Sequence, residues 1–148
     1  MTTLDPARLS PEQLAPMLRA WARGMLATDA AVDLLIGHDV WLRREDFRAA
    51  LVDAVDDGWG TGGAIGPMAA VDWGGGQTYL GTAVWSRSEA AVLRLAASLA
   101  GATPTTSLAE MTSGLDDLNA ALVRDALARR FGCHERDRPA ARTRSFLY

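Results

Sequence analysis

The chain has 148 residues, of which 49% are hydrophobic and 22% are charged. This length suits a single domain, and this composition excludes intrinsic disorder, collagen-like repeats and low-complexity segments. The longest stretch without a charged residue, Leu95–Ala109, is shorter than the ~20 apolar residues that cross a bilayer. Because the first ten residues also lack the basic start and apolar run of a secretory signal, we expect a cytoplasmic protein with no membrane partner.

The charge is unevenly distributed along the chain, and all 15 basic residues are arginines. Residues 1–128 hold 9 arginines and 16 acidic residues, whereas residues 129–148 hold 6 arginines and 2 acidic residues. An isoelectric point near 5.3 excludes a protein whose whole surface follows nucleic-acid phosphates. Only the arginine-rich end of the chain has the charge for such a contact.

Two helix starts carry a capping pattern. Ser10 and Gln13 have the spacing of a capping box in front of an apolar stripe that continues to about residue 26. Ser86 and Glu89 repeat this spacing before a helix that Gly101 ends. The helix that starts at Ser86 carries few charges, so we expect it to lie at the centre of the core.

Three further helices follow from apolar spacing, at residues 29–36, 44–55 and 115–131. Gly37 is expected to end the first of these. In the second, Phe47, Leu51 and Val55 form a ladder with four-residue spacing, which is typical of one helix face.

Residues 58–81 contain 9 of the 14 glycines and are expected to be irregular. The short apolar pieces at 69–71 and 79–85 are compatible with buried turns, short helices or a small hairpin. Together these patterns predict an all-α or predominantly α fold, a compact bundle of about five helices with a Gly/Trp-rich irregular segment. We assign residues 1–132 to a single helical domain and residues 133–148 to an arginine-rich tail.

The segment from Gly58 to Gly63 matches the G-x-G-x-x-G spacing of dinucleotide-binding loops. That motif needs a strand before its first glycine and a helix that opens at its third. The pattern here predicts a helix before it and no helix after it. We therefore interpret these residues as a glycine-rich loop.

Five tryptophans are many for a chain of this size. Trp21, Trp41 and Trp85 lie in apolar patterns and are expected in the core, whereas Trp59 and Trp73 lie in the glycine-rich segment. Aromatic residues are enriched at the centres of protein interfaces. Trp59 and Trp73 are thus candidate partner-binding residues, although filling the core is the alternative for each.

His38 and Cys133 are the residues with the most reactive side chains. His38 follows a glycine near a helix end and could serve as a general base, but no nucleophile is identifiable near it, so capping or burial is the simpler interpretation. Cys133 is the single cysteine, and together with His134 and Glu135 it forms too small and crowded a group for zinc. We therefore assign no catalytic residue, no metal site and no cofactor.

The tail combines basic and aromatic residues. It could bind phosphates or an acidic groove, could dock back onto the domain, or could be a solvated terminus. Its candidate partner-binding residues are Arg136, Arg138, Arg142, Arg144, Phe146 and Tyr148.

Four segments together resemble a group of small actinobacterial proteins of uncharacterised function. The resemblance spans about residues 33–131 and implies a bacterial, cytosolic, helical domain, and it carries no functional residue. The segments are Asp33–Phe47, Ala70–Trp73, Ser88–Ala100 and Leu115–Asn119.

Taken together, the sequence favours a non-enzymatic protein-interaction module, such as a small adaptor, a regulator or a self-associating subunit, whose partner is another protein or a second copy. The first alternative is a nucleic-acid accessory protein that binds through the arginine-rich tail. The second is a small enzyme that uses His38.

Overall fold

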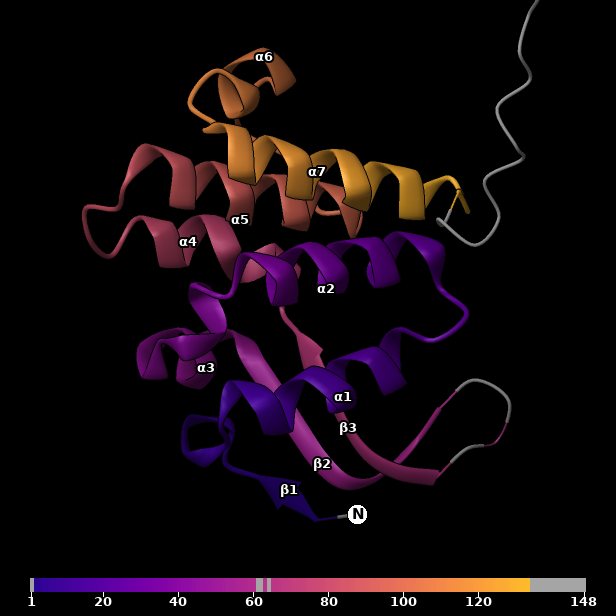
Figure 1. The fold of residues 1–148 in the computed structure, drawn as a ribbon. Coiled ribbons are helices and arrows are strands. Elements are labelled where there is room, and N and C mark those ends of the chain that lie inside the picture. The colour runs from indigo at the N-terminus through magenta and orange to yellow at the C-terminus, as the bar shows by residue number, and fades with distance from the viewer. Residues whose placement is uncertain (1, 61–62, 64, 134–148) are drawn as a thin grey trace, which may run out of the picture.

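The computed structural model describes residues 2–60, 63 and 65–133. Within them lie seven α-helices and a three-stranded antiparallel sheet, so the prediction of an all-α bundle of about five helices is wrong (Figure 1). The fold is mixed α/β. The helices are α1 (Pro11–Ala22), α2 (Leu26–His38), α3 (Glu45–Leu51), α4 (Gly76–Leu80), α5 (Arg87–Leu99), α6 (Leu108–Thr112) and α7 (Asp117–Arg130), with short 3-10 helices η1 (Pro6–Arg8), η2 (Trp41–Arg43) and η3 (Trp73–Gly75). The strands are β1 (Thr3–Leu4), β2 (Val52–Trp59) and β3 (Ile65–Val71).

The sheet has the order β1-β2-β3, and β2 and β3 form a long hairpin. Val52 pairs with Val71 at the inner end, and Trp59 pairs with Ile65 at the outer end. The register shifts between Val55 and Gly58, where the pairing is irregular. β1 covers only the first half of β2, so the outer half of the hairpin extends past it.

The helix predicted over residues 44–55 ends early, because α3 stops at Leu51 and β2 begins at the next residue. Phe47 and Leu51 are buried as predicted, but Val55 lies in the strand. Pairing with β1 and β3 decides the conformation here. Val52 and Ala54 are buried and Asp53 between them is exposed, which is the two-residue alternation of a strand with one buried face.

The glycine-rich segment is more regular than predicted. Its first part forms the outer half of the hairpin, whereas η3 and α4 occupy residues 73–80, so 79–85 is not a strand. Gly58 has a packing role in the hairpin, because a Cβ atom there would lie 3.0 Å from both Cβ and Sδ of Met68. A side chain at position 58 would therefore require Met68 to shift by a few tenths of an ångström.

Gly37 does not end the second helix. α2 continues to His38, and Asp39, with a φ of 55°, forms the left-handed cap. A Cβ atom on Gly37 would lie 3.1 Å from Cδ2 of Leu122 in α7. The glycine therefore allows α2 and α7 to approach closely.

α2 lies between two layers, with α5 and α7 on one side and α1 with the sheet on the other (Figure 1). The core accordingly has two clusters of buried side chains. α2 contributes Leu35 to the first and Leu34 to the second, while α5 contributes Leu93 and Val92 in the same way. α5 therefore joins both clusters, but α2 and not α5 is the helix that lies between the two layers. None of the helices in the described residues is both long and apolar enough to cross a bilayer.

The tryptophans divide between core and surface. Trp41 is fully buried, donates to the Glu89 carbonyl at 3.2 Å, and stacks edge-on against Trp85, which lies at the edge of the first cluster. Trp21 was expected in the core but is 43% exposed. Ala22, the next residue of α1, takes the buried position and leaves Trp21 on the rim of the helix.

The capping box predicted at Ser10 is complete, whereas at Ser86 only the serine half of the predicted box is formed. Ser10 accepts from the Gln13 amide at 3.1 Å, and the Gln13 side chain accepts from the Ser10 amide at 2.8 Å. Ser86 accepts from the Glu89 amide at 3.1 Å. These bonds satisfy amides that a helix N-terminus leaves without a partner.

A buried arginine fastens the N-terminal segment to the core. The guanidinium of Arg48 in α3 donates to the carbonyls of Leu42 at 2.8 Å, Ala7 at 3.0 Å and Pro6 at 3.2 Å. No carboxylate of the described residues forms an ion pair with it. Three backbone carbonyls thus solvate one buried cation, and this ties η1 and η2 to α3.

We predict that Arg48→Met lowers the free energy of unfolding by about 2–4 kcal/mol, because it keeps the buried stem but removes the donor of the Leu42 and Ala7 carbonyls, while the Pro6 carbonyl keeps the Leu9 amide. Urea unfolding followed by circular dichroism measures this loss. Arg8→Met is the control, since Arg8 is exposed and a surface substitution usually changes stability by no more than about 0.5 kcal/mol. Equal stability of the two variants would contradict a fastening role for Arg48.

Candidate functional site

The outer end of the β2–β3 hairpin presents an exposed apolar pair. Trp59 is 73% exposed and its cross-strand partner Ile65 is 63% exposed. We call this pair the hairpin tip. Tryptophan is usually highly buried, so an indole in this position is unusual for a surface that contacts only water.

Acidic residues precede the hairpin tip on β2. Asp56 and Asp57 are both exposed, and each accepts from the amide of Thr2. The bond from Thr2 is the main reason that the pKa of Asp56 lies below its ordinary value. The hairpin tip is therefore an exposed apolar pair with negative charge beside it.

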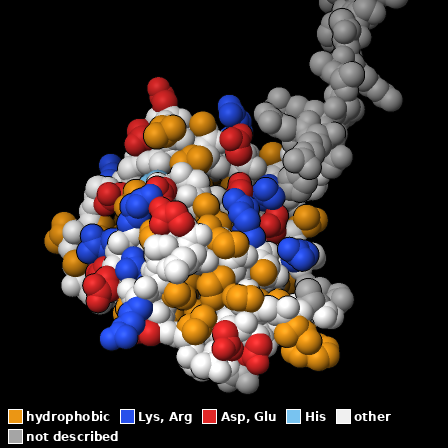
Figure 2. Space-filling view, turned by 60° about the horizontal axis from the view of Figure 1, so that its bottom comes forward, with side chains coloured by type: hydrophobic (Ala, Val, Ile, Leu, Met, Phe, Trp, Pro, Cys, Tyr) orange, Lys and Arg blue, Asp and Glu red, His pale blue; other side chains and the backbone are white. Residues whose placement is uncertain are grey.

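The hairpin lies at the edge of the molecule, away from α5 and α7 (Figure 1). Figure 2 shows the side formed by the sheet and α1, on which apolar side chains gather between acidic and basic ones. Several large apolar residues are exposed at the end of α1 and the start of α2. They are Trp21, Met25 and Leu26.

Trp73, the second tryptophan suggested as a partner-binding residue, lies elsewhere. It begins η3 just after β3, whereas Trp59 pairs with the first residue of that strand. The six residue steps along β3 place the two positions roughly 20 Å apart. Trp73 is half-buried and packs against both core clusters. The structure therefore assigns the two tryptophans to different surroundings.

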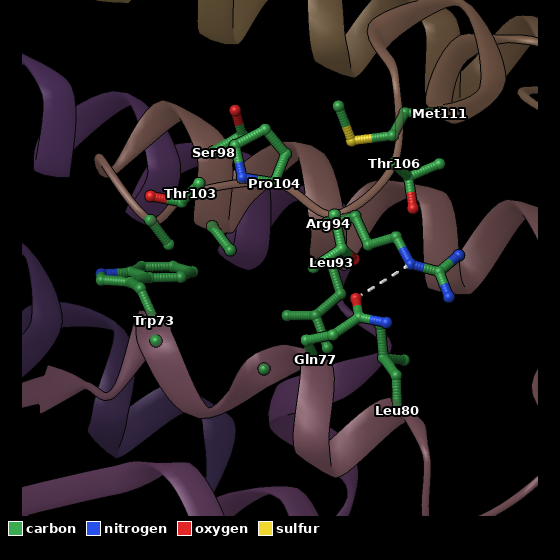
Figure 3. A pocket seen from close by; sticks show the side chains of 15 residues that line it. Trp73, Gln77, Leu80, Leu93, Arg94, Ser98, Thr103, Pro104, Thr106 and Met111 are labelled. Atoms are coloured by element: carbon green, nitrogen blue, oxygen red, sulfur yellow. Dashed lines mark hydrogen bonds between the residues drawn. The ribbon is translucent and has the colours of Figure 1, made fainter.

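Trp73 lines a cavity of about 260 Å³ between α4, α5, α6 and the segment 102–106. Buried apolar side chains of Leu80, Leu93 and Met111 contribute to its wall. Figure 3 shows the indole of Trp73 on one side of this space and the guanidinium of Arg94 on the other. The hydroxyl-bearing residues of the wall are Ser98, Thr103, Thr105 and Thr106.

Arg94 is the charged residue of the cavity. It is half-buried, and its Nε donates to Oε1 of Gln77 at 3.4 Å (Figure 3). No carboxylate of the described residues forms an ion pair with it. Arginine stays protonated at physiological pH, so the cavity contains one positive charge that the described protein does not neutralise. Sequence reasoning missed this site, because Trp73 and Arg94 come together only through the tertiary fold.

The G-x-G-x-x-G segment does not form a dinucleotide site. A strand does precede Gly58, contrary to the helix that the sequence suggested, but the chain enters β3 at Ile65, only two residues after Gly63. A helix N-terminus is therefore absent at the position where such loops hold a pyrophosphate. The segment closes the hairpin.

His38 is the last residue of α2 and is half-buried. Its Nδ1 atom is buried and has no hydrogen-bond partner in the described residues. Burial lowers the pKa of His38 below its ordinary value, against a weaker opposite effect of Glu89, Asp116 and Asp39. No described serine, threonine or cysteine side chain is hydrogen-bonded to this nitrogen, so the described residues show no nucleophile activated by it.

The remaining predicted site residues give no further site. Cys133 is exposed and unbridged, and within the described residues no group of three acidic, histidine or cysteine side chains is placed to hold a metal ion. The tail residues proposed for partner binding lie outside the described residues. They are Arg136, Arg138, Arg142, Arg144, Phe146 and Tyr148.

Comparison with protein-family models, with curated proteins and with solved structures finds no match to this chain. The resemblance to small actinobacterial proteins therefore stays an expectation from the sequence. Any function must be argued from the surfaces described above.

We predict that His38 makes the protein less stable in acid. Because its pKa is lowered in the folded state, the unfolded chain takes up the proton first as the pH falls. The loss of stability begins as the pH drops below the ordinary value of 6.5 and is complete below the folded-state pKa. Urea unfolding at a pH of about 7.5 and of about 5.5 measures it.

His38→Gln removes the titrating group, so the difference between the two pH values should be smaller in this variant than in the parent protein. Carboxylates titrate in both proteins, and their contribution cancels in this comparison. An equal loss of stability in both proteins would show that the imidazole is not responsible.

Proposed function

We propose that the chain is a non-enzymatic binding domain of a bacterial cytoplasm, and that it contacts another protein through the hairpin tip. The exposure of Trp59 is the observation that supports this proposal. A tryptophan that leaves water for a partner surface buries 150–250 Å², and tryptophan is among the residues that dominate measured interface energies.

The backbone of the hairpin favours this use of Trp59. Cross-strand pairing with Ile65 holds the two apolar residues side by side before any partner arrives. The backbone therefore loses little conformational entropy on binding. Ile65 adds a second apolar contact at the same place.

The charge near the hairpin tip indicates the kind of partner. Asp56 and Asp57 suit a partner with an apolar pocket and basic residues around it. A contact between the tips of two copies would bring four aspartates together, which is unfavourable. Residues 1–133 as a whole hold 16 acidic residues and 11 arginines, which also opposes pairing of two domains. We therefore favour a different protein over a second copy.

A photoreactive residue in place of Trp59 tests the proposal in cells that produce the protein. We expect it to form a cross-link to one discrete protein. The same residue at Val84 is the control, because Val84 is 100% exposed but stands in an irregular segment far from the hairpin in sequence. Cross-links of equal pattern from both positions would contradict the proposal.

Binding of the purified partner then measures the contribution of Trp59. Trp59→Ser should weaken binding roughly 30-fold or more, as expected for an interface hot spot, while Val84→Ser should leave it unchanged. Higher salt should weaken binding of the parent protein, because the acidic flank faces basic residues. A dimer that depends on Trp59, detected by sedimentation, would identify a second copy as the partner. That result would overturn the preference for a different protein.

A further inference from the structure

We infer that the cavity between α4, α5 and α6 binds a small organic anion that consists of a flat apolar group and a carboxylate or phosphate. This binding site is independent of the hairpin tip. It rests on three features of the cavity, namely its charge, its aromatic wall and its size.

The charge selects an anion. Among the described residues that line the cavity, Arg94 alone has a charged side chain, and no described carboxylate neutralises it. A guanidinium presents several N–H groups in one plane, which matches the oxygens of a carboxylate or a phosphate. Its one bond in the cavity, to Gln77, uses Nε at the long distance of 3.4 Å, so the terminal nitrogens keep donors for a ligand.

Hydroxyl groups around the cavity add neutral donors. Ser98, Thr105 and Thr106 belong to its lining, and none of their side chains is hydrogen-bonded to another described residue. Hydroxyl groups both donate and accept, so they can complete the bonds of an anion without adding a competing charge.

The apolar part of the ligand follows from the wall opposite Arg94. Trp73 lines this side with its indole, and Figure 3 shows Leu93 in the space between the indole and the guanidinium. An apolar pocket with a few polar groups at one place is the usual form of a small-molecule site. A ligand that spans the cavity would meet the indole with its flat group and Arg94 with its anion.

The size limits the ligand. Pockets for drug-sized molecules have about 300–1,000 Å³, and this cavity has about 260 Å³. A single ring with one anionic group fits such a volume, whereas a dinucleotide does not. The structure thus points to a small aromatic or similarly flat acid.

Calorimetric titration of the full chain with four small probes tests the site. The probes are benzoate, phenyl phosphate, benzyl alcohol and inorganic phosphate, so ring and charge are varied separately. We expect benzoate or phenyl phosphate to bind at least tenfold more tightly than benzyl alcohol and than inorganic phosphate. The tighter of the two aromatic anions identifies the anionic group.

Two variants and one control variant locate the binding. Arg94→Gln should lower the affinity for the more tightly bound aromatic anion at least tenfold, to the affinity for benzyl alcohol. Arg87→Gln, which removes an arginine of the same helix outside the cavity, should leave the affinity unchanged. Ala97→Phe, which fills the cavity and keeps Arg94, should abolish binding of both aromatic anions.

Three results would overturn the inference. The first is the absence of saturable binding of either aromatic anion up to about 10 mM. The second is equal affinity of the parent protein and Arg94→Gln, and the third is unchanged binding by Ala97→Phe. If Ala97→Phe does not fold, amide chemical shifts of residues 94–106 in the parent protein report the location, and shifts confined to other segments count against the site.

Discussion

The burial of α2 between two layers is the constraint on which the rest of the structure depends. This helix is apolar on nearly every side, and its residues enter both core clusters. A helix of this kind is stable in water only when other elements cover it all round. α5 and α7 cover one side, and α1 covers the other with the sheet behind it. Gly37 brings α7 close enough for Leu122 to reach the backbone of α2.

The helices could be predicted from the sequence wherever their signals are local. Ser10 and Ser86 cap amides three residues away. The short sequence motif that predicts each helix start therefore includes both residues of the capping hydrogen bond. The sheet depends instead on pairs that are distant in sequence, such as Val52 with Val71. The ladder of Phe47, Leu51 and Val55 fits a helix throughout, and only the alternation around Asp53 indicated a strand. The short helix α6 also carried a local signal, because Ser107 accepts from the Glu110 amide.

The candidate sites were less accessible to sequence reasoning, because each combines residues through the fold. Trp59 was proposed from its glycine-rich surroundings, but its cross-strand neighbour Ile65 appears only when the register of the hairpin is known. Trp73 was proposed too, but it is half-buried against the core, whereas Trp59 is exposed. In the sequence, Arg94 is only one of the few charged residues of a helix that was expected to be buried. Only the placement of the segment 102–106 over α5 shows that its guanidinium faces a cavity.

The direct junction of α3 and β2 has a consequence for the mechanics of the domain. Because no residue separates Leu51 from Val52, the helix passes into the strand without a loop at the base of the hairpin on this side. Arg48, one turn earlier, is bonded to three carbonyls of the N-terminal part of the chain. A displacement of Trp59 would therefore act on α3 through β2, and on the N-terminal segment through the bonds of Arg48.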